Sequence, residues 1–91
     1  MTKNAFRQYI KEGHDIEWKY NGIEFGIIPK DTNDDGNTCI SVYKSHTGPI
    51  YYVSTFEELI NINFFGVTVM EMLESLGDEE DAEKRGDLVI Y

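Results

Sequence analysis

Early in the chain stands the run 16-IEWKYNGIEFGII-28, in which apolar and polar residues alternate on both sides of Asn21-Gly22. Two alternating runs joined by Asn-Gly predict a β-hairpin, because a type I′ turn needs positive φ at both central residues. The turn also sets the register, so one face carries three apolar cross-strand pairs: Tyr20 with Ile23, Trp18 with Phe25, and Ile16 with Ile27. A slip of one residue would turn all six side chains to the wrong face.

The residues around this hairpin extend the pattern. Residues 2–12 place Phe6 and Ile10 on one helical face, and Gly13 suits the end of that helix. On the polar face of the hairpin Lys19 lies opposite Glu24. We expect Pro29 to close the second strand, because proline donates no ladder hydrogen bond. A polar loop over 30–37, a third strand over 38–44 and a fourth over 50–53 then complete the expected sheet.

The pattern changes to helical spacing after residue 53. Ser54 with Glu57, or Thr55 with Glu58, fits a capping box, and Thr68 with Glu71 fits a second one. Residues 61–66 form a connector between these two helices, and 78–87 form a charged, exposed segment. The apolar end, 88–91, is expected to dock as an edge strand or to serve as a peptide for a partner.

These elements predict one α+β domain over residues 1–91. It has an N-terminal helix, a three- to four-stranded antiparallel meander, and two short C-terminal helices packed on one face. The residues expected in its core are Phe6, Ile10, Ile16, Trp18, Phe25, Ile27, Phe56, Leu59 and Leu73.

Composition narrows the classes of function. The net charge is −9, and residues 46–91 hold ten acids but only two bases. Such a field repels nucleic acid and anionic membranes and attracts a basic protein surface, although it also serves plain solubility. The chain has no long apolar run and no apolar leader, so we expect a cytoplasmic protein. A lone cysteine, Cys39, rules out an internal disulfide and is expected to be a buried apolar residue.

Motifs for chemistry are weak. Residues 31–36, Asp-Thr-Asn-Asp-Asp-Gly, match the first half of an EF-hand loop, but position twelve is Val42, and a turn between strands explains the same residues. His14 and His46 lack metal-ligand spacing. Glu71 and Glu74, one helical turn apart, fit a solvent-facing helix surface better than a catalytic pair. We therefore expect a non-enzymatic protein without a metal or cofactor; a small enzyme would need a pocket that holds one of the two histidines beside a carboxylate.

Two sets of residues are candidates for binding. The acidic set is expected to occupy the basic cleft of a partner by electrostatic mimicry, whereas the aromatic set suits an apolar protein interface. Tyr51 and Tyr52 alternate along one strand, so one of them is expected to be exposed. The acidic set is Glu71, Glu74, Asp78, Glu79, Glu80, Asp81 and Glu83, and the aromatic set is Tyr51, Phe64 and Phe65, with residues 88–91 as a further candidate.

The residues 15–25, 56–60 and 66–73 resemble small uncharacterised proteins of Gram-positive bacteria and their phages, which share a helix, a Tyr-Asn-Gly hairpin and a closing helical pair. The resemblance implies an accessory protein of a mobile element. In that setting small acidic proteins often inhibit host nucleases, as anti-restriction and anti-CRISPR proteins do.

The expected function is therefore an acidic, DNA-mimic-like inhibitor that binds a partner with a basic surface, such as a nuclease. The alternative is a structural or regulatory interaction module that uses its aromatic surface. Neither hypothesis involves direct binding of nucleic acid or of a membrane, and a homodimer is compatible with both.

Overall fold

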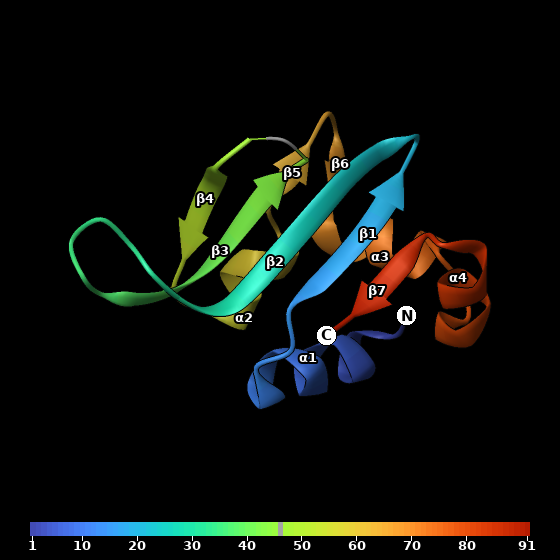
Figure 1. The fold of residues 1–91 in the computed structure, drawn as a ribbon, viewed down its shortest axis with the longest axis horizontal. Helices are drawn as coiled ribbons and strands as arrows, with labels where there is room; N and C mark the ends of the chain where they lie inside the picture. The colour runs from blue at the N-terminus through green and yellow to red at the C-terminus, as the bar shows by residue number, and fades with distance from the viewer. Residues whose placement is uncertain (46) are drawn as a thin grey trace.

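The fold is α+β, as the sequence predicts, and a computed structural model describes residues 1–45 and 47–91 (Figure 1). The elements in chain order are α1 (Lys3–Glu12), β1 (Ile16–Tyr20), β2 (Ile23–Thr32), β3 (Thr38–Lys44), β4 (Pro49–Val53), α2 (Phe56–Ile60), β5 (Asn63–Phe64), β6 (Val67–Thr68), α3 (Val69–Ser75), α4 (Glu79–Arg85) and β7 (Leu88–Ile90).

The sheet has the order β4-β3-β2-β1-β7, and the four pairings between neighbouring strands are antiparallel. The predicted register of the first hairpin is confirmed, including the Lys19–Glu24 pair, whose Nζ and Oε1 lie 3.9 Å apart. Asn21 (φ 50°) and Gly22 (φ 77°) both have positive φ, as the type I′ turn requires. The apolar end of the chain docks as the edge strand β7, with Leu88 beside Trp18.

The prediction that Pro29 closes the second strand is wrong. β2 continues through Pro29 to Thr32, and its register with β3 shifts between Ile28 and Asp31. A bulge leaves residues of the longer strand unpaired, so a proline without an N–H is accommodated there at little cost. The predicted polar loop therefore shrinks to residues 33–37.

The C-terminal half contains more structure than predicted. Thr55 is the N-cap of α2, and its hydroxyl accepts from the Glu58 N–H. Of the two capping pairs that the sequence allows, Thr55 with Glu58 therefore forms, and the Glu58 carboxylate accepts from the Ser54 N–H. The expected connector 61–66 contains strand β5, whose hairpin with β6 turns at Phe65 and Gly66. The capping box of Thr68 and Glu71 at the start of α3 is confirmed.

The segment 78–87 is not merely an exposed charged segment, because it contains helix α4. Asp78 caps its first turn by accepting from the Asp81 N–H, and Gly86 ends it at φ 79°. Ala82 is fully buried and anchors the helix to the core. The caps and this one buried residue stabilise α4. The helix was not predicted because its sequence has no apolar stripe at helical spacing.

The core lies between one face of the sheet and the helices. Figure 1 shows α2 and α3 behind the sheet and α1 beside its lower end, while the other face is open. Trp18 stacks on Phe25 with 5.5 Å between ring centroids, and Phe25 in turn contacts Phe64 at 4.8 Å. Eight of the nine predicted core residues are buried; Phe56 is only partly buried, against Phe6.

We expect Thr68→Ala to destabilise the protein by about 1 kcal/mol, because it removes the acceptor of the Glu71 N–H at the start of α3. For a domain of this size that corresponds to a fall in Tm of about 4–8 °C. Thermal unfolding followed by circular dichroism measures the change. Thr68→Ser keeps the hydroxyl and is the matched control; an equal loss in both variants would show that the cap contributes nothing.

Candidate functional site

The acidic residues singled out in the sequence lie on α3, on α4 and on the turn between them. Six of the seven side chains are exposed and Glu79 is half-buried. Over residues 71–87 the chain carries eight acids and two bases. The structure therefore keeps the predicted acidic set on the surface, and it places most of that set on α4 and its N-cap.

The two bases of this region lie in the last turn of α4 and are engaged there. Lys84 Nζ lies 3.5 Å from Glu80 Oε1, one helical turn away. Arg85 donates to Asp87 Oδ2 at 3.1 Å and to the Leu76 carbonyl at 3.0 Å. The positive charge is thus tied to the C-terminal end of the helix, where it also favours the helix dipole. The first turn presents only carboxylates.

A hollow of about 540 Å³ separates α4 from the start of the chain. It is lined by Met1, Thr2, Tyr9, Gly77, Asp78, Glu79, Glu80 and Glu83. Across it the Tyr9 hydroxyl donates to Glu79 Oε2 at 2.6 Å, and the N-terminal ammonium donates to the Leu73 and Gly77 carbonyls at 3.2 and 2.6 Å. The hydrogen bond to Glu79, with burial and nearby carboxylates, raises the pKa of Tyr9 to about 12.

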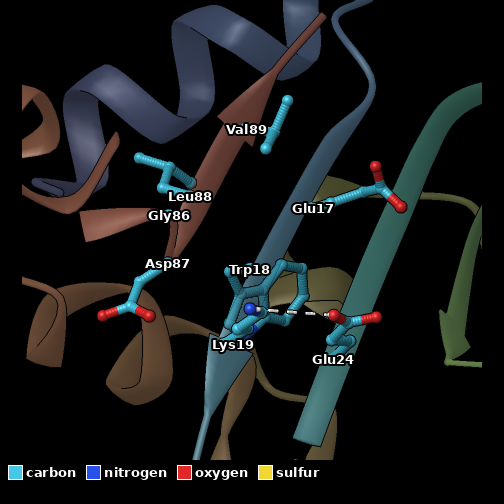
Figure 2. A pocket seen from close by; sticks show the side chains of 8 residues that line it. All are labelled: Glu17, Trp18, Lys19, Glu24, Gly86, Asp87, Leu88 and Val89. Carbon is cyan, nitrogen blue, oxygen red and sulfur yellow. Dashed lines mark ion pairs between the residues drawn. The ribbon is translucent and has the colours of Figure 1, made fainter. Parts of the chain in front are cut away.

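A second group of carboxylates lies on the open face of the sheet, and sequence reasoning missed it. A hollow of about 240 Å³ is lined there by residues of β1, β2 and β7 and of the turn before β7. Figure 2 shows Glu17 and Glu24 on one side of this hollow and Asp87 on the other, with Lys19 paired to Glu24. The hollow is smaller than the 300–1,000 Å³ typical of small-molecule sites.

Two tyrosine hydroxyls converge on Glu17, one from β3 and one from the residue that follows β7. Tyr43 donates to Oε2 at 3.4 Å and Tyr91 donates to Oε1. The Tyr43 ring crosses Gly26 so closely that a Cβ there would lie 2.0 Å from the ring, which explains glycine at this position. Burial and the charge of Glu17 raise the pKa of Tyr43 to about 12, and the hydrogen bond to Glu17 raises that of Tyr91.

The aromatic candidates differ in exposure, although the rings of Tyr51 and Phe64 are in edge contact with 5.5 Å between their centroids. Phe65 is 80% exposed at the tip of the β5–β6 hairpin, with φ 56° and Lys44 Nζ 5.7 Å from its ring centroid. The prediction of Phe64 as a surface residue is wrong, because β5 turns its ring onto Phe25 in the core, whereas Phe65 lies in the turn that follows β5. Exposure was expected for one of Tyr51 and Tyr52, and both are more than 40% exposed because β4 is an edge strand.

The residues weighed for metal or thiol chemistry have structural roles. Asp31 accepts from Ser41 and Thr32 at the end of β2, and Asn33 Oδ1 accepts from the Asp35 and Asn37 N–H groups, so the motif forms the end of a strand and the turn that follows it. Cys39 is buried, and burial raises the pKa of its thiol.

His14 is half-buried just after α1, with its Nε2 3.7 Å from Glu12 Oε1, and it lines none of the hollows described above. His46 lies outside the described residues. Within residues 1–45 and 47–91, no group of three or more His, Cys, Asp or Glu side chains is placed to hold a metal ion.

Comparisons with protein-family models, with curated proteins and with solved structures found no match for this chain. In the part of the chain that the structure describes, no helix is long and apolar enough to cross a membrane. The site must therefore be interpreted from its own geometry.

The raised tyrosine pKa values predict a loss of stability at high pH. Tyr9 and Tyr43 titrate near 12 in the folded protein and near their ordinary 10.0 when unfolded. The folded state thus favours their neutral forms, and this contribution is complete below pH 10 and is lost as the pH rises towards 12. Denaturant unfolding at a series of alkaline pH values measures the loss; a flat profile over this window would contradict the assignment.

Glutamine substitutions separate the two clusters. We expect Glu17→Gln to lower the pKa of Tyr43 and Tyr91 and to leave Tyr9 unchanged, while Glu79→Gln lowers only that of Tyr9. The fall at Tyr43 is partial, because burial is the larger cause there. Tyrosinate absorbance during alkaline titration reports all three groups, and each variant is the control for the other.

Proposed function

We propose that this protein is a non-enzymatic binding protein that inserts the acidic surface of α3 and α4 into the basic, nucleic-acid-binding cleft of a partner protein. Such an activity is that of a DNA-mimic-like inhibitor of the anti-restriction or anti-CRISPR type, carried by a phage or mobile element. One observation carries the proposal: the carboxylates of α4 stand on a helix that is capped at both ends and anchored by buried Ala82.

Charge placement supports this function over simple solubility. An acidic protein that needs only solubility gains the same benefit from carboxylates spread over its whole surface. Here residues 1–45 are close to neutral and the surplus lies in 46–91, where six of the ten acids are on α3 and α4. A field concentrated on one side steers association with a basic surface and disfavours wrong orientations.

The rigidity of α4 supports the same conclusion. A flexible acidic tail pays an ordering cost when it binds, whereas a preformed helix does not. Side chains three or four residues apart on such a helix lie about 5–6 Å from one another, so the carboxylates form a fixed array. Asp78, Glu79, Glu80 and Glu83 also line one hollow, and this brings them to a single face.

A second candidate function is an interaction module that uses exposed aromatic side chains, and Phe65 favours it. A phenylalanine at φ 56° and 80% exposure is strained and costly in water. Both features suit an anchor that a partner protein covers. Salt distinguishes the two functions, because charge-driven binding weakens as ionic strength rises and apolar binding does not.

The test is affinity capture from host lysate with elution by rising salt, followed by direct binding measurements on the captured protein. Asp81→Asn with Glu83→Gln neutralises two exposed carboxylates of α4. Asp34→Asn with Asp35→Asn removes the same charge from the distant 33–37 loop and is the matched control. At about 0.2–1 kcal/mol for each exposed ion pair, the α4 variant should bind roughly 2- to 30-fold more weakly.

A nucleic-acid-binding protein that is released by moderate salt and is affected only by the α4 variant supports the proposal. Equal weakening by both double variants would indicate net charge alone. Salt-resistant binding that Phe65→Ser abolishes would replace the acidic inhibitor by the aromatic module.

A further inference from the structure

The outer strand β4 has a free edge. β3 pairs with it on one side, and within the described residues no strand lies on the other (Figure 1). Ile50, Tyr51 and Tyr52 are each 43–44% exposed, and together they are half of the large exposed apolar side chains of the described chain. An edge strand with unpaired backbone groups and apolar side chains is a template for pairing with another strand.

Charged residues, one of the usual protections of an edge, are missing from β4, and its other protections, Pro49 and a register shift against β3, lie only at its first residues. Natural edge strands carry lysines, inward charges or prolines, or are very short. Residues 49–53 contain no charged side chain, and Pro49 stands only at the first position. The opposite edge, β7, has three residues and follows Asp87, so it is shorter and better guarded.

Charge selects the occupant of this edge. The chain has 17 acids, yet residues 36–56, which include β3 and β4, contain none. Two copies of a protein with net charge −9 repel each other over most of their surfaces, whereas β4 itself carries no charge. The acids that act on β4 are Asp31 and Asp34: burial raises the pKa of Tyr52, and these two charges raise it further. A two-fold axis brings the same edge of two copies together, so that the two strands run antiparallel and can pair with each other.

We propose that β4 pairs with β4 of a second copy of this chain, antiparallel and centred on Tyr51, so that two five-stranded sheets become one continuous sheet. In this register Tyr51 meets Tyr51 of the second copy, and Ile50 lies beside Tyr52 of the second copy. Aromatic pairs and aromatic pairs with β-branched residues are among the favourable cross-strand contacts. This interface is independent of the acidic surface and goes beyond the proposed function.

The size of the edge predicts a weak dimer. An aromatic side chain buries about 150–250 Å² in full, so the exposed parts of Ile50, Tyr51 and Tyr52 give roughly 250–300 Å² in each copy. The side chains of both copies thus supply roughly 500–600 Å², which is below the roughly 1,000 Å² of a stable specific interface, so only weak, transient pairing is expected. The equilibrium between monomer and dimer should therefore depend visibly on protein concentration.

Analytical ultracentrifugation of the full chain over roughly a hundredfold range of concentration tests the dimer. Ile50→Lys places a charge in the interface twice in each symmetric dimer, and we expect dimerisation to fall by about tenfold or more. Val89→Lys makes the same change at a residue of equal exposure, 43%, on the opposite edge and is the matched control.

A disulfide trap tests the register. In a Cys39→Ala background, Tyr51→Cys places two thiols opposite each other, at the Cα separation of about 4.5–5.5 Å that antiparallel pairs have and disulfides accept. Tyr52→Cys in the same background holds its thiols two residues out of register, at roughly 8 Å, where no bridge forms without movement. Non-reducing electrophoresis after mild oxidation compares the two variants.

A concentration-dependent dimer that is lost in Ile50→Lys, kept in Val89→Lys and trapped by Tyr51→Cys rather than Tyr52→Cys supports the proposal. A strict monomer overturns it. A dimer that survives Ile50→Lys overturns it as well, because another surface then forms the interface. A monomer whose binding to a different protein is lost in Ile50→Lys would assign the edge to a foreign strand instead.

Discussion

The stacking of Trp18 on Phe25 across the first hairpin is the contact on which the rest of the fold depends. Both side chains are almost fully buried, and each belongs to a strand that recruits a further strand: β1 pairs with β7, and β2 pairs with β3. The helices then cover the face that these rings define. A one-residue slip would bury Glu17 and Lys19 in their place, so the register of this hairpin is strongly selected.

This hairpin was predictable because its information is local: a turn that needs positive φ, flanked by alternating residues. Helix α4 was not, since its stability comes from the caps Asp78 and Gly86 and from burial of Ala82, while charge dominates its sequence. The end of the second strand was wrongly predicted at Pro29 for a related reason. A proline normally ends a paired strand, but the bulge that tolerates it depends on the partner strand and leaves no mark in the sequence around it.

The two groups of carboxylates also differ in whether local sequence reveals them. The acidic set is visible in the sequence because its members are near neighbours in the chain, and local exposure keeps them together. The cluster at Glu17 depends on strand order, since Tyr43 and Tyr91 lie 26 and 74 residues away along the chain. Only the pairing of β1 with β7 on one side, and with β2 and then β3 on the other, brings the three groups to one face, and one sequence cannot reveal such a strand order.

The two proposed surfaces lie at opposite ends of the sheet, and this separation has an energetic consequence. Helix α4 stands beside β7, whereas β4 forms the other edge, along a molecule whose longest dimension is 38 Å (Figure 1). Joining two copies through β4 would leave their acidic helices apart by far more than the screening length of about 8 Å at physiological salt. Repulsion between those helices therefore opposes pairing very little, and the dimer would present two acidic surfaces that face away from each other.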